Sequence, residues 1–469
     1  MLTSLALSAG ASGQGQSGAR SGKMDADWEA IWKHKVPAWF QNGKLGIFIH
    51  WGLYSVPAWA PTTGELGKVD WSKWFRENPY AEWYLNTLRI EDSPTRKHHV
   101  ETFGAQFDYY RFADTFNRDT AKWDPAQWAT LFQKTGARYA VLTTKHHDGF
   151  RLWPSAVANP RRNRAEITAS RDLVGDLARA VRAAGMKMGL YYSGGLDWTF
   201  TEQPIRSVAD LSGTAPRGED YVRYADAHWT ELTDRYQPAV MWNDIGYPSR
   251  DSLPRLFSHY YNTVPEGVIN NRFSVDFSDF TTPEYSNYDK IVDKKWESCR
   301  GLGFSFGYNR NEGPGVVIEA EKLVWLLVDI VSKNGNLLLN IGPRPDGSIS
   351  EIQTDRLTKL GAWLAVNGEG IFDTQPWVRP SGSEAGAAEV RFTRKDNVVY
   401  AFCEKRESTL VIPGVIAAAG TKVRVLGSEA DSEWQQRGRD LAVSLPAPVT
   451  GDFAIGVRIA PEPWQVVRG

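Results

Sequence analysis

Polar and aromatic side chains follow the ends of six strand-like apolar runs in this chain. The set comprises His50 and Trp51; His146, His147 and Asp148; Tyr191 and Tyr192; Trp242, Asn243 and Asp244; Asn270, Asn271 and Arg272; and Asn340. Each residue alone has an ordinary structural explanation, since a strand-end aspartate often caps a helix or forms a turn. Together, these residue types can transfer protons, carry negative charge and bind hydroxyl groups. Their repetition after six runs predicts one polar, aromatic active site.

The adjacent histidines His146 and His147, followed by Asp148, raise the question of a metal site. Neighbouring side chains on an extended segment point to opposite sides, so such a pair rarely binds one ion. The sequence also contains no HExxH motif and no cluster of cysteines. We therefore expect no metal ion and no organic cofactor. We expect the imidazoles to form hydrogen bonds with ligand hydroxyls, because each can donate and accept.

Carboxylates remain as the groups that carry the reaction. No GxSxG serine motif is present, and Cys299 and Cys403 lie outside the strand-end motifs. The chain has 20 Trp, 18 Tyr and 20 Phe. These rings offer large flat apolar surfaces, on which the C–H faces of sugars can stack. Glycoside hydrolysis commonly needs two carboxyl groups, and Asp244 is the first candidate. The second stays open among four glutamates, Glu82, Glu284, Glu297 and Glu312.

Strand-like runs alternate with helical patterns between residues 24 and 375. The predicted strands are Gly46–His50, Arg138–Thr144, Met186–Tyr192, Ala239–Asn243, Val268–Asn271 and Asn336–Ile341. The predicted helices are Asp124–Thr135, Asp172–Ala184, Tyr221–Tyr236 and Ile318–Lys333. This alternation predicts an α/β fold with a parallel sheet, and the number of units favours a (β/α)8-like TIM barrel over a doubly wound sheet. Barrel enzymes carry their active sites at the carboxyl ends of the strands, where the polar residues lie.

The two ends of the chain depart from this pattern. Residues 1–23 are predicted to be a disordered N-terminal extension, because they are rich in Gly, Ser and Gln. Their ambiguous apolar start leaves open whether the protein is cytoplasmic or exported. Residues 376–469 are predicted to form a C-terminal antiparallel β-sandwich after a catalytic domain over 24–375. Its alternating runs are Glu389–Phe392, Val398–Cys403, Thr409–Ile412, Lys422–Leu426, Leu441–Leu445 and Phe453–Ile459.

The composition excludes several classes of protein. The chain of 469 residues has 54 Lys and Arg against 55 Asp and Glu, a formal net charge of -1. It therefore lacks the basic excess of a nucleic-acid binder, and we expect no nucleic-acid partner. No apolar run reaches the ~20 residues that span a bilayer, so we expect no membrane partner. Two cysteines make a disulfide framework implausible.

Eight sequence blocks together resemble the α-L-fucosidases of glycoside hydrolase family twenty-nine. They are GIFIHWGLYSVPAW (46–59), NPYAEWY (78–84), TTKHHDGF (143–150), GLYYSGGLDW (189–198), WNDIGYP (242–248), TTPEY (281–285), WESCRGLGFSFGYN (296–309) and LLLNIGPRPDG (337–347). The blocks run in family order over about residues 27–375, and a following β-sandwich also fits the family. The resemblance implies a retaining exo-α-L-fucosidase that works by double displacement through a covalent fucosyl-enzyme intermediate on fucosylated glycans or glycosides.

The same resemblance implies a role for each matching residue. Asp244 matches the family's nucleophile, and Glu284 matches the general acid/base, with Arg272 at the expected distance before it in the sequence. Glu82 and Glu297 are the other candidates for the acid/base. Glu82 is instead expected to bind a sugar hydroxyl, and Glu297 fits a structural turn as well as it fits the active site. The residues that match the lining of the fucose pocket are His50, Trp83, His146, His147, Tyr191 and Trp242. Phe48 is expected either to contact the C6 methyl group of fucose or to pack in the barrel core.

Two other functions fit the residues. A glycosidase for another sugar would use the same carboxylate chemistry with a different pocket. A catalytically silent fucose-binding protein would keep the aromatic residues and lose a carboxylate, whereas Asp244 and Glu284 are both present. The sequence does not determine the linkage, the aglycone or the state of a possible homo-oligomer. Residues 60–77 and 199–220 are long loop candidates that are expected to shape the aglycone side or an oligomer contact.

Overall fold

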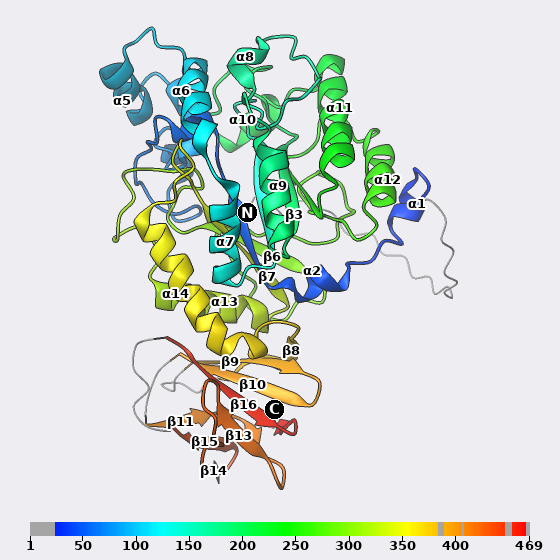
Figure 1. The fold of residues 1–469 in the computed structure, drawn as a ribbon, viewed down its shortest axis with the longest axis vertical. Helices are drawn as coiled ribbons and strands as arrows, with labels where there is room; N and C mark the ends of the chain where they lie inside the picture. Colours follow the sequence, from blue (N-terminus) through cyan, green and yellow to red (C-terminus); the bar gives the residue numbers. More distant parts are fainter. Residues whose placement is uncertain (1–23, 383–388, 405–407, 446–452, 466–469) are drawn as a thin grey trace.

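The computed structural model describes residues 24–382, 389–404, 408–445 and 453–465 (Figure 1). The predicted extension over residues 1–23 lies outside the described residues. A large α/β barrel is followed by a smaller all-β domain, which lies against α13 (Ala320–Ser332) and α14 (Glu351–Asn367). The predicted fold class is confirmed. The boundary between residues 375 and 376 stays a prediction.

Seven parallel strands form the barrel sheet, in the spatial order β5-β4-β3-β2-β1-β7-β6. They are β1 (Leu45–Ile49), β2 (Tyr139–Lys145), β3 (Lys187–Ser193), β4 (Val240–Asp244), β5 (Val268–Ile269), β6 (Trp296–Gly301) and β7 (Gly335–Ile341). The segment 280–284 lies between the two edges, because Phe280 pairs with Asn270 after β5 and Thr281 pairs with Trp296 of β6. These isolated parallel bridges close the sheet in the manner of a (β/α)8 barrel.

Helices pack around the sheet. The longer ones besides α13 and α14 are α5 (Pro94–Phe103), α6 (Phe112–Asp119), α7 (Pro125–Thr135), α9 (Leu173–Ala183), α11 (Glu219–Tyr236) and α12 (Leu253–Thr263). The shorter ones are α1 (Trp28–Ile31), α2 (Ala38–Gly43), α3 (Trp71–Trp74), α4 (Tyr84–Leu88), α8 (Arg164–Ile167) and α10 (Val208–Gly213). Local sequence fixes α7 at both ends: the Asp124 side chain caps its first turn, Pro125 begins it, and Gly136 ends it in the left-handed conformation.

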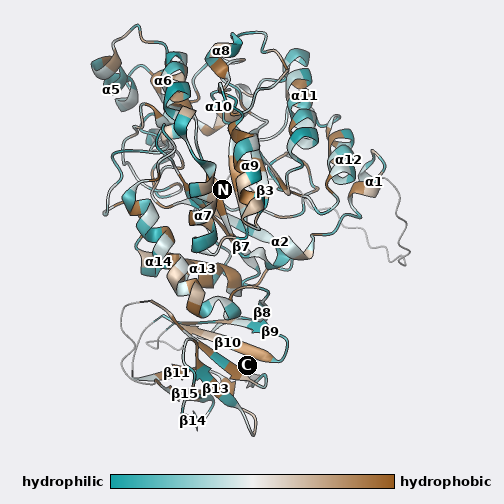
Figure 2. Ribbon diagram, in the orientation of Figure 1, coloured by the Kyte–Doolittle hydropathy of each residue, from teal (hydrophilic) through white to brown (hydrophobic). Residues whose placement is uncertain are grey.

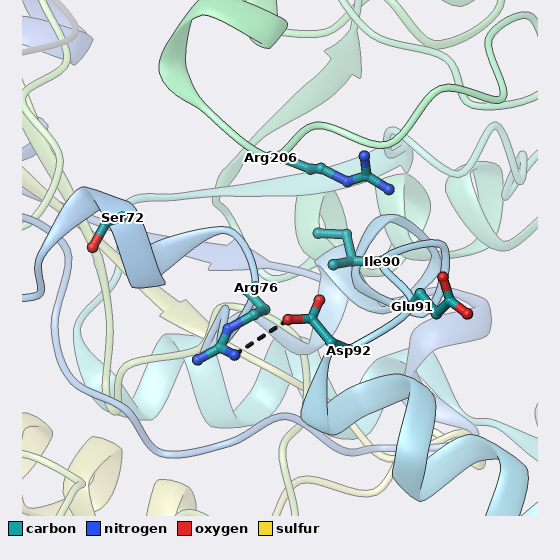
Figure 3. Close-up of a pocket in the computed structure, with 6 residues that line it drawn as sticks. All are labelled: Ser72, Arg76, Ile90, Glu91, Asp92 and Arg206. Atoms are coloured by element: carbon teal, nitrogen blue, oxygen red, sulfur yellow. Dashed lines mark hydrogen bonds and ion pairs between the residues drawn. The ribbon is translucent and has the colours of Figure 1, made fainter.

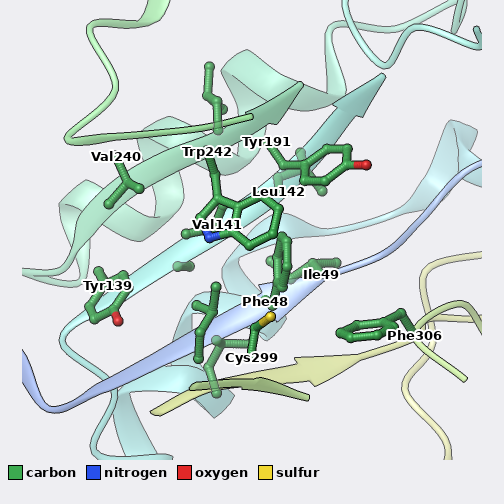
Figure 4. Packing of buried hydrophobic residues seen from close by; sticks show 14 of the residues in the cluster. Phe48, Ile49, Tyr139, Val141, Leu142, Tyr191, Val240, Trp242, Cys299 and Phe306 are labelled. Atoms are coloured by element: carbon green, nitrogen blue, oxygen red, sulfur yellow. The ribbon is translucent and has the colours of Figure 1, made fainter. Parts of the chain in front are cut away.

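The barrel core is continuous and rich in aromatic rings (Figure 4). Every residue of β1, β2, β4 and β7 is buried, as expected for strands covered by helices on one face and by the barrel interior on the other. Phe48 of β1 lies against Trp242 of β4, with ring centroids 5.2 Å apart, and is 1% exposed. The core packing that the sequence allowed for Phe48 is therefore present.

Strand β6 is the barrel strand that the sequence patterns did not predict. Its sequence, WESCRG, has no continuous apolar run and no clear alternation, yet nearly all of it is buried. Glu297 lies in this strand, so the interpretation of Glu297 as part of a turn is wrong. The predicted strand Val268–Asn271 is also shorter than expected, since β5 covers only Val268–Ile269.

The C-terminal domain contains antiparallel sheets, one of five strands in the order β13-β16-β10-β9-β8 and one of three in the order β11-β15-β14, with a small β12-β17 pair. The strands are β8 (Gln375–Gly382), β9 (Val390–Lys395), β10 (Val398–Cys403), β11 (Thr409–Ile412), β12 (Val415–Ile416), β13 (Lys422–Val425), β14 (Trp434–Arg437), β15 (Asp440–Ser444), β16 (Ile455–Ala460) and β17 (Trp464–Gln465). All six predicted runs overlap strands, which confirms the predicted sandwich.

The junction between the two domains is partly apolar and partly charged. Trp363 of α14 packs on Phe402 of β10 with ring centroids 5.8 Å apart, and Arg391 of β9 donates to Asp329 of α13 at 2.6 Å. Figure 2 shows α13 as largely hydrophobic, in agreement with its position between the barrel and the second domain. Among the described residues, no helix combines the length and apolar character that crossing a bilayer requires.

Candidate active site

The carboxyl ends of the barrel strands bring the predicted residues to one place. Asp244 is the last residue of β4, and Tyr191 lies in β3, the neighbouring strand. His146 and His147 directly follow β2, and His50 follows β1. Because all these strands are parallel, side chains at their carboxyl ends converge at one end of the barrel.

Asp244 is held by three groups. The Tyr191 hydroxyl donates to Oδ2 at 2.9 Å, and Nη1 of Arg272 and the backbone N–H of Ile245 each donate to Oδ1 at 3.0 Å. Nε2 of His147 lies 3.9 Å from Oδ2, too far for a direct hydrogen bond. Asp244 is 8% exposed. The carboxylate is thus oriented by its neighbours and keeps a small exposed surface.

Arg272 connects the two predicted carboxyl groups. Besides Asp244, its Nη2 donates to Oε2 of Glu284 at 2.9 Å, and its Nε donates to Oγ1 of Thr282 at 2.9 Å. The guanidinium lies over the Trp242 ring, 4.6 Å from the centroid. These contacts fix the plane of the guanidinium, so that one cation faces two anions in a defined geometry.

Glu284 lies on the segment that closes the barrel, where it pairs with Cys299 of β6 through a parallel bridge. The Tyr80 hydroxyl donates to its Oε1 at 2.9 Å. Its side chain is 20% exposed, against 12% for that of Asp244. Glu284 is therefore the more accessible member of the pair. Tyr80 is a residue that we did not predict, although it lies in the block NPYAEWY.

The three histidines of the site are buried and uncharged near neutral pH. Burial lowers the pKa of His50 to about 3 and that of His147 to about 4, and it lowers the pKa of His146 well below its usual value. Nδ1 of His50 lies 2.6 Å from Oδ1 of Asn340, which is an acceptor. The neutral His50 ring therefore donates through Nδ1 and presents Nε2 as an acceptor.

The same reasoning assigns the tautomer of His147. Its Nδ1 lies 2.7 Å from Oγ of Ser193, and the Ser193 hydroxyl donates its hydrogen bond to the backbone oxygen of Leu196. Nδ1 of His147 must then be the donor, which leaves Nε2 as an acceptor on the side of Asp244. Nδ1 of His146 has no hydrogen-bond partner among the described residues. Buried donors and acceptors of this kind suit a ligand rich in hydroxyl groups.

Aromatic rings form the walls of the site. Trp83 makes edge contacts with His147 and with Trp198, at centroid distances of 5.4 and 5.5 Å. Tyr191 stacks on Trp242 at 5.5 Å. Phe306 lies 4.9 Å from His50. Trp198 and Phe306 were not predicted as site residues, and only their place inside the sequence blocks could have pointed to them.

The other three glutamates bind partners other than Arg272. Glu82 accepts from the backbone N–H of Gly307 at 2.7 Å, and burial raises its pKa to about 7. Glu297 accepts from the indole N–H of Trp242 at 3.1 Å and from the Tyr139 hydroxyl, and burial raises its pKa to about 7 as well. These contacts make Glu297 a support beneath the Trp242 ring.

Glu312 accepts from the backbone N–H groups of Phe304 and Ser305 at 2.8 and 2.7 Å. It therefore fixes a loop next to the site. Among the described residues, Asp244 and Glu284 are the two acidic side chains that pair with Arg272.

Comparison with known proteins decides the family. A family model described as Alpha-L-fucosidase matches residues 12–369, well over half of the chain. The chain belongs to the α-L-fucosidase family. The predicted activity, that of a glycoside hydrolase acting as an α-L-fucosidase, is thereby confirmed, and the alternatives of another sugar specificity and of a silent binding protein lose their support.

Individual fucosidases match over nearly the whole chain. The tissue α-L-fucosidase of Homo sapiens is 33% identical over 453 residues, which cover 92% of this chain and 91% of the relative. That of Rattus norvegicus is 32% identical over 445 residues, covering 92% and 90%. The crystal structure of Thermotoga maritima α-fucosidase is 45% identical, with a TM-score of 0.84, and covers 93% of this chain and 100% of that chain. An α-L-fucosynthase of the same organism, with an aspartate replaced by glycine, matches at 45% identity and a TM-score of 0.87, covering 93% and 100%.

Proposed function

We propose that this fucosidase is a member of glycoside hydrolase family twenty-nine that removes terminal α-L-fucosyl groups with retention of configuration. Asp244 is the nucleophile and Glu284 the general acid/base. The observation that carries the proposal is the guanidinium of Arg272, which binds Asp244 and Glu284 at once at the carboxyl end of the barrel. Retaining glycosidases place two carboxyl groups close together, about 5–5.5 Å apart, because one of them must reach the anomeric carbon directly.

The first step forms a covalent intermediate. An oxygen of Asp244 attacks C1 of the fucosyl group, the bond from C1 to the leaving oxygen breaks, and Glu284 gives that oxygen a proton. The hydrogen bonds from Tyr191 and Arg272 hold the attacking carboxylate in place. Oriented groups of this kind lower the barrier because the geometry is fixed before the reaction begins.

The second step releases fucose. Glu284 takes a proton from water, and that water attacks C1, which frees Asp244. While Asp244 is esterified it carries no charge, so Glu284 is the anionic partner that remains for Arg272. The ion pair then favours the carboxylate form of Glu284, which the second step requires. Arg272 is thus a positioning residue. Its ionic partners are Asp244 and Glu284 in the free enzyme, and Glu284 alone while Asp244 is esterified.

The fucose pocket is assigned to the residues around this pair. Nε2 of His50 and Nε2 of His147 accept hydrogen bonds from sugar hydroxyls, since the tautomers derived above leave both as acceptors. His146 and Glu82 add further polar contacts, while Trp83, Tyr191 and Trp242 supply flat apolar surfaces. A structure of the Thermotoga maritima enzyme in complex with fucose, 44% identical with a TM-score of 0.85, supports this class of ligand.

The substrates proposed are fucosylated glycans or glycosides. The Thermotoga maritima fucosynthase is in complex with α-L-Fuc-(1-2)-β-L-Fuc-N3, a fucosyl group attached to a second sugar. This complex supports a substrate in which the terminal unit enters the pocket and the rest of the glycan lies outside. In that fucosynthase an aspartate is replaced by glycine, which supports the proposal that hydrolysis needs an aspartate carboxylate.

Proton NMR of the first product tests retention. The wild-type enzyme acting on 4-nitrophenyl α-L-fucoside should release α-fucose first, before mutarotation to the mixture of anomers. Initial release of β-fucose would show direct attack by water and would overturn the proposed double displacement. The control is free α-fucose under the same conditions, which gives the rate of mutarotation.

A further inference from the structure

Two charged residues of the sequence blocks have no part in the mechanism above, although both adjoin site residues. Lys145 is the last residue of β2 and precedes His146, and Asp197 precedes Trp198 in the loop after β3. Nζ of Lys145 donates to Oδ2 of Asp197 at 2.8 Å, and both side chains are fully buried. Because taking two charges out of water is costly, a buried ion pair is weak evidence for stability, and a role in the site has to be considered.

The surroundings of the ion pair satisfy both partners. The backbone N–H and the hydroxyl of Thr199 donate to Oδ1 of Asp197 at 3.0 and 2.6 Å. The ammonium of Lys145 also lies over the Tyr192 ring, 4.6 Å from the centroid. Burial lowers the pKa of Lys145, and the charge of Asp197 opposes that shift. Each charge depends on the other, since removing one leaves its partner buried and uncompensated.

The loop that carries Asp197 holds His147 on two sides. The Ser193 hydroxyl donates to the backbone oxygen of Leu196 at 2.7 Å, which leaves Oγ as the acceptor for Nδ1 of His147. The backbone N–H of Trp198 donates to the backbone oxygen of His147 at 2.7 Å, and the two rings pack with centroids 5.4 Å apart. Leu196 and Trp198 directly precede and follow Asp197. The ion pair thus anchors the loop between its two contacts with the histidine.

Gly149 shows how closely this loop packs on the histidine segment 145–149. Its φ is +79°, and a Cβ at this position would lie 2.8 Å from Oδ1 of Asp197 and 2.6 Å from Cγ2 of Thr199. Real Cβ atoms essentially never approach other atoms so closely. Because no free space separates the two segments, a displacement of the loop displaces the histidine segment as well.

We propose that Lys145 and Asp197 are positioning residues that act on fucose binding through His147. Their ion pair holds the loop so that Nδ1 of His147 donates to Ser193 and Nε2 stays an acceptor, 3.9 Å from Oδ2 of Asp244. In that position Nε2 accepts a hydrogen bond from a fucosyl hydroxyl. This inference rests on the proposed function, because it concerns the same pocket, and it gives a role to two residues that touch no reacting atom.

The test measures how tightly the site binds L-fucose, as a competitive inhibitor of the hydrolysis of 4-nitrophenyl α-L-fucoside. The variants are Lys145→Met, Asp197→Asn and the double variant, which removes both charges and leaves no buried ion without a partner. Each should raise the inhibition constant of fucose about ten-fold, the scale of one lost hydrogen bond. A merely structural role would lower the folded fraction and hence kcat, and it would leave the inhibition constant of the folded enzyme unchanged.

A double-mutant cycle tests the route through His147. His147→Phe keeps a flat ring and removes the acceptor Nε2. Adding Asp197→Asn to this variant should raise the inhibition constant less than two-fold further, because the contact that the ion pair supports is already lost. If the two effects multiply instead, the ion pair does not act through His147 and the inference is wrong.

Two other ion pairs provide matched controls. Asp329→Asn breaks the pair with Arg391 at the domain junction, whose side chains are 13% and 14% exposed, and should lower the melting temperature without changing the inhibition constant. Asp92→Asn breaks the pair with Arg76, at 3.3 Å, on the lining of a cavity shown in Figure 3. These two side chains are 70% and 42% exposed, so this control should change neither quantity.

Every other outcome overturns the inference. An unchanged inhibition constant in the ion-pair variants would show that the pair does not position the site. If the single variants do not fold, the double variant decides by the same comparison. A ten-fold rise in Asp329→Asn as well would assign the effect to a general loss of stability. Failure of folded wild type to hydrolyse the aryl fucoside would instead overturn the fucosidase function, which keeps the two claims distinguishable.

Discussion

Asp244 and Glu284 share one guanidinium: an oxygen of Asp244 lies 3.0 Å from Nη1 of Arg272, and an oxygen of Glu284 lies 2.9 Å from Nη2. The two carboxyl groups come from different elements, the end of β4 and the segment that closes the barrel. Their shared partner places them together, which is what a double displacement requires.

Replacing the proposed nucleophile should abolish hydrolysis. We expect Asp244→Gly to lose about 10³–10⁴-fold in kcat on aryl fucosides, because no carboxylate remains to attack C1. Added azide should restore turnover by entering the vacated space, and it should form the β-fucosyl azide, since it attacks opposite the leaving group. Asp251→Gly, on an exposed loop, is the control and should keep full activity. An α-azide, or activity near that of wild type, would exclude Asp244 as the nucleophile.

Replacing the proposed acid/base should have an effect that depends on the leaving group. Glu284→Ala should lose little in kcat/KM on dinitrophenyl fucoside and about 10²–10⁴-fold on substrates with poor leaving groups, which need the proton. Azide should now give the α-fucosyl azide, because it attacks the intermediate on Asp244. The matched controls are Glu82→Gln and Glu297→Gln. If either of these shows the leaving-group dependence and Glu284→Ala does not, the assignment of Glu284 is wrong.

Tyr80 should act through Glu284. The variant Tyr80→Phe removes the 2.9 Å hydrogen bond to Oε1 and keeps the ring, whose edge contact with Phe306 has a centroid distance of 5.4 Å. We expect a loss of roughly five- to ten-fold in kcat/KM. The loss should be larger for poor leaving groups, because a less fixed Glu284 transfers its proton less well. A uniform loss across a leaving-group series would indicate that Tyr80 only supports the fold.

Acid should destabilise the protein through its buried histidines. The folded pKa values of His50 and His147 are about 3 and about 4, below the ~6.5 of an unfolded histidine. Between pH 6.5 and 4 the unfolded chain therefore binds more protons, and the free energy of unfolding falls as pH falls, by about 1.4 kcal/mol per pH unit for each histidine. Below the folded pKa values both histidines are protonated in the folded and the unfolded protein, so their contribution to the free energy of unfolding no longer depends on pH.

The measurement is urea unfolding of wild type and His147→Gln at pH 7 and pH 5. The difference between the two proteins isolates the histidine, because Glu82 and Glu297, with pKa values raised to about 7, act in the opposite sense in both. The variant should lose less stability on acidification than wild type. Equal losses would contradict a neutral, buried His147.

The strand-end residues could be predicted because one physical rule places them. Once β1 to β4 are recognised as parallel strands of a barrel, His50, His147, Tyr191 and Asp244 must lie at the same end. The tautomers of the histidines could not be predicted, because they depend on Asn340 and Ser193 as partners from other strands.

Glu284 could not be chosen by pattern alone. Its segment, TTPEY, has no strand periodicity and is held by isolated bridges to Trp296 and Cys299 of β6. The resemblance to known fucosidases singled it out instead. Tyr80 and Phe306 were missed for a related reason: they lie on loops, and their contacts with Glu284 and His50 come from the folding of distant segments.

The central claim is a covalent bond between fucose and Asp244. A 2-deoxy-2-fluoro fucosyl fluoride should esterify the enzyme with loss of fluoride and leave it inactive, since the 2-fluoro group slows the second step. Mass spectrometry of the intact protein should show one added sugar, and the digest should place it on the peptide that contains Asp244. A label on Glu284 or on another residue, or turnover with no label at all, would contradict the account.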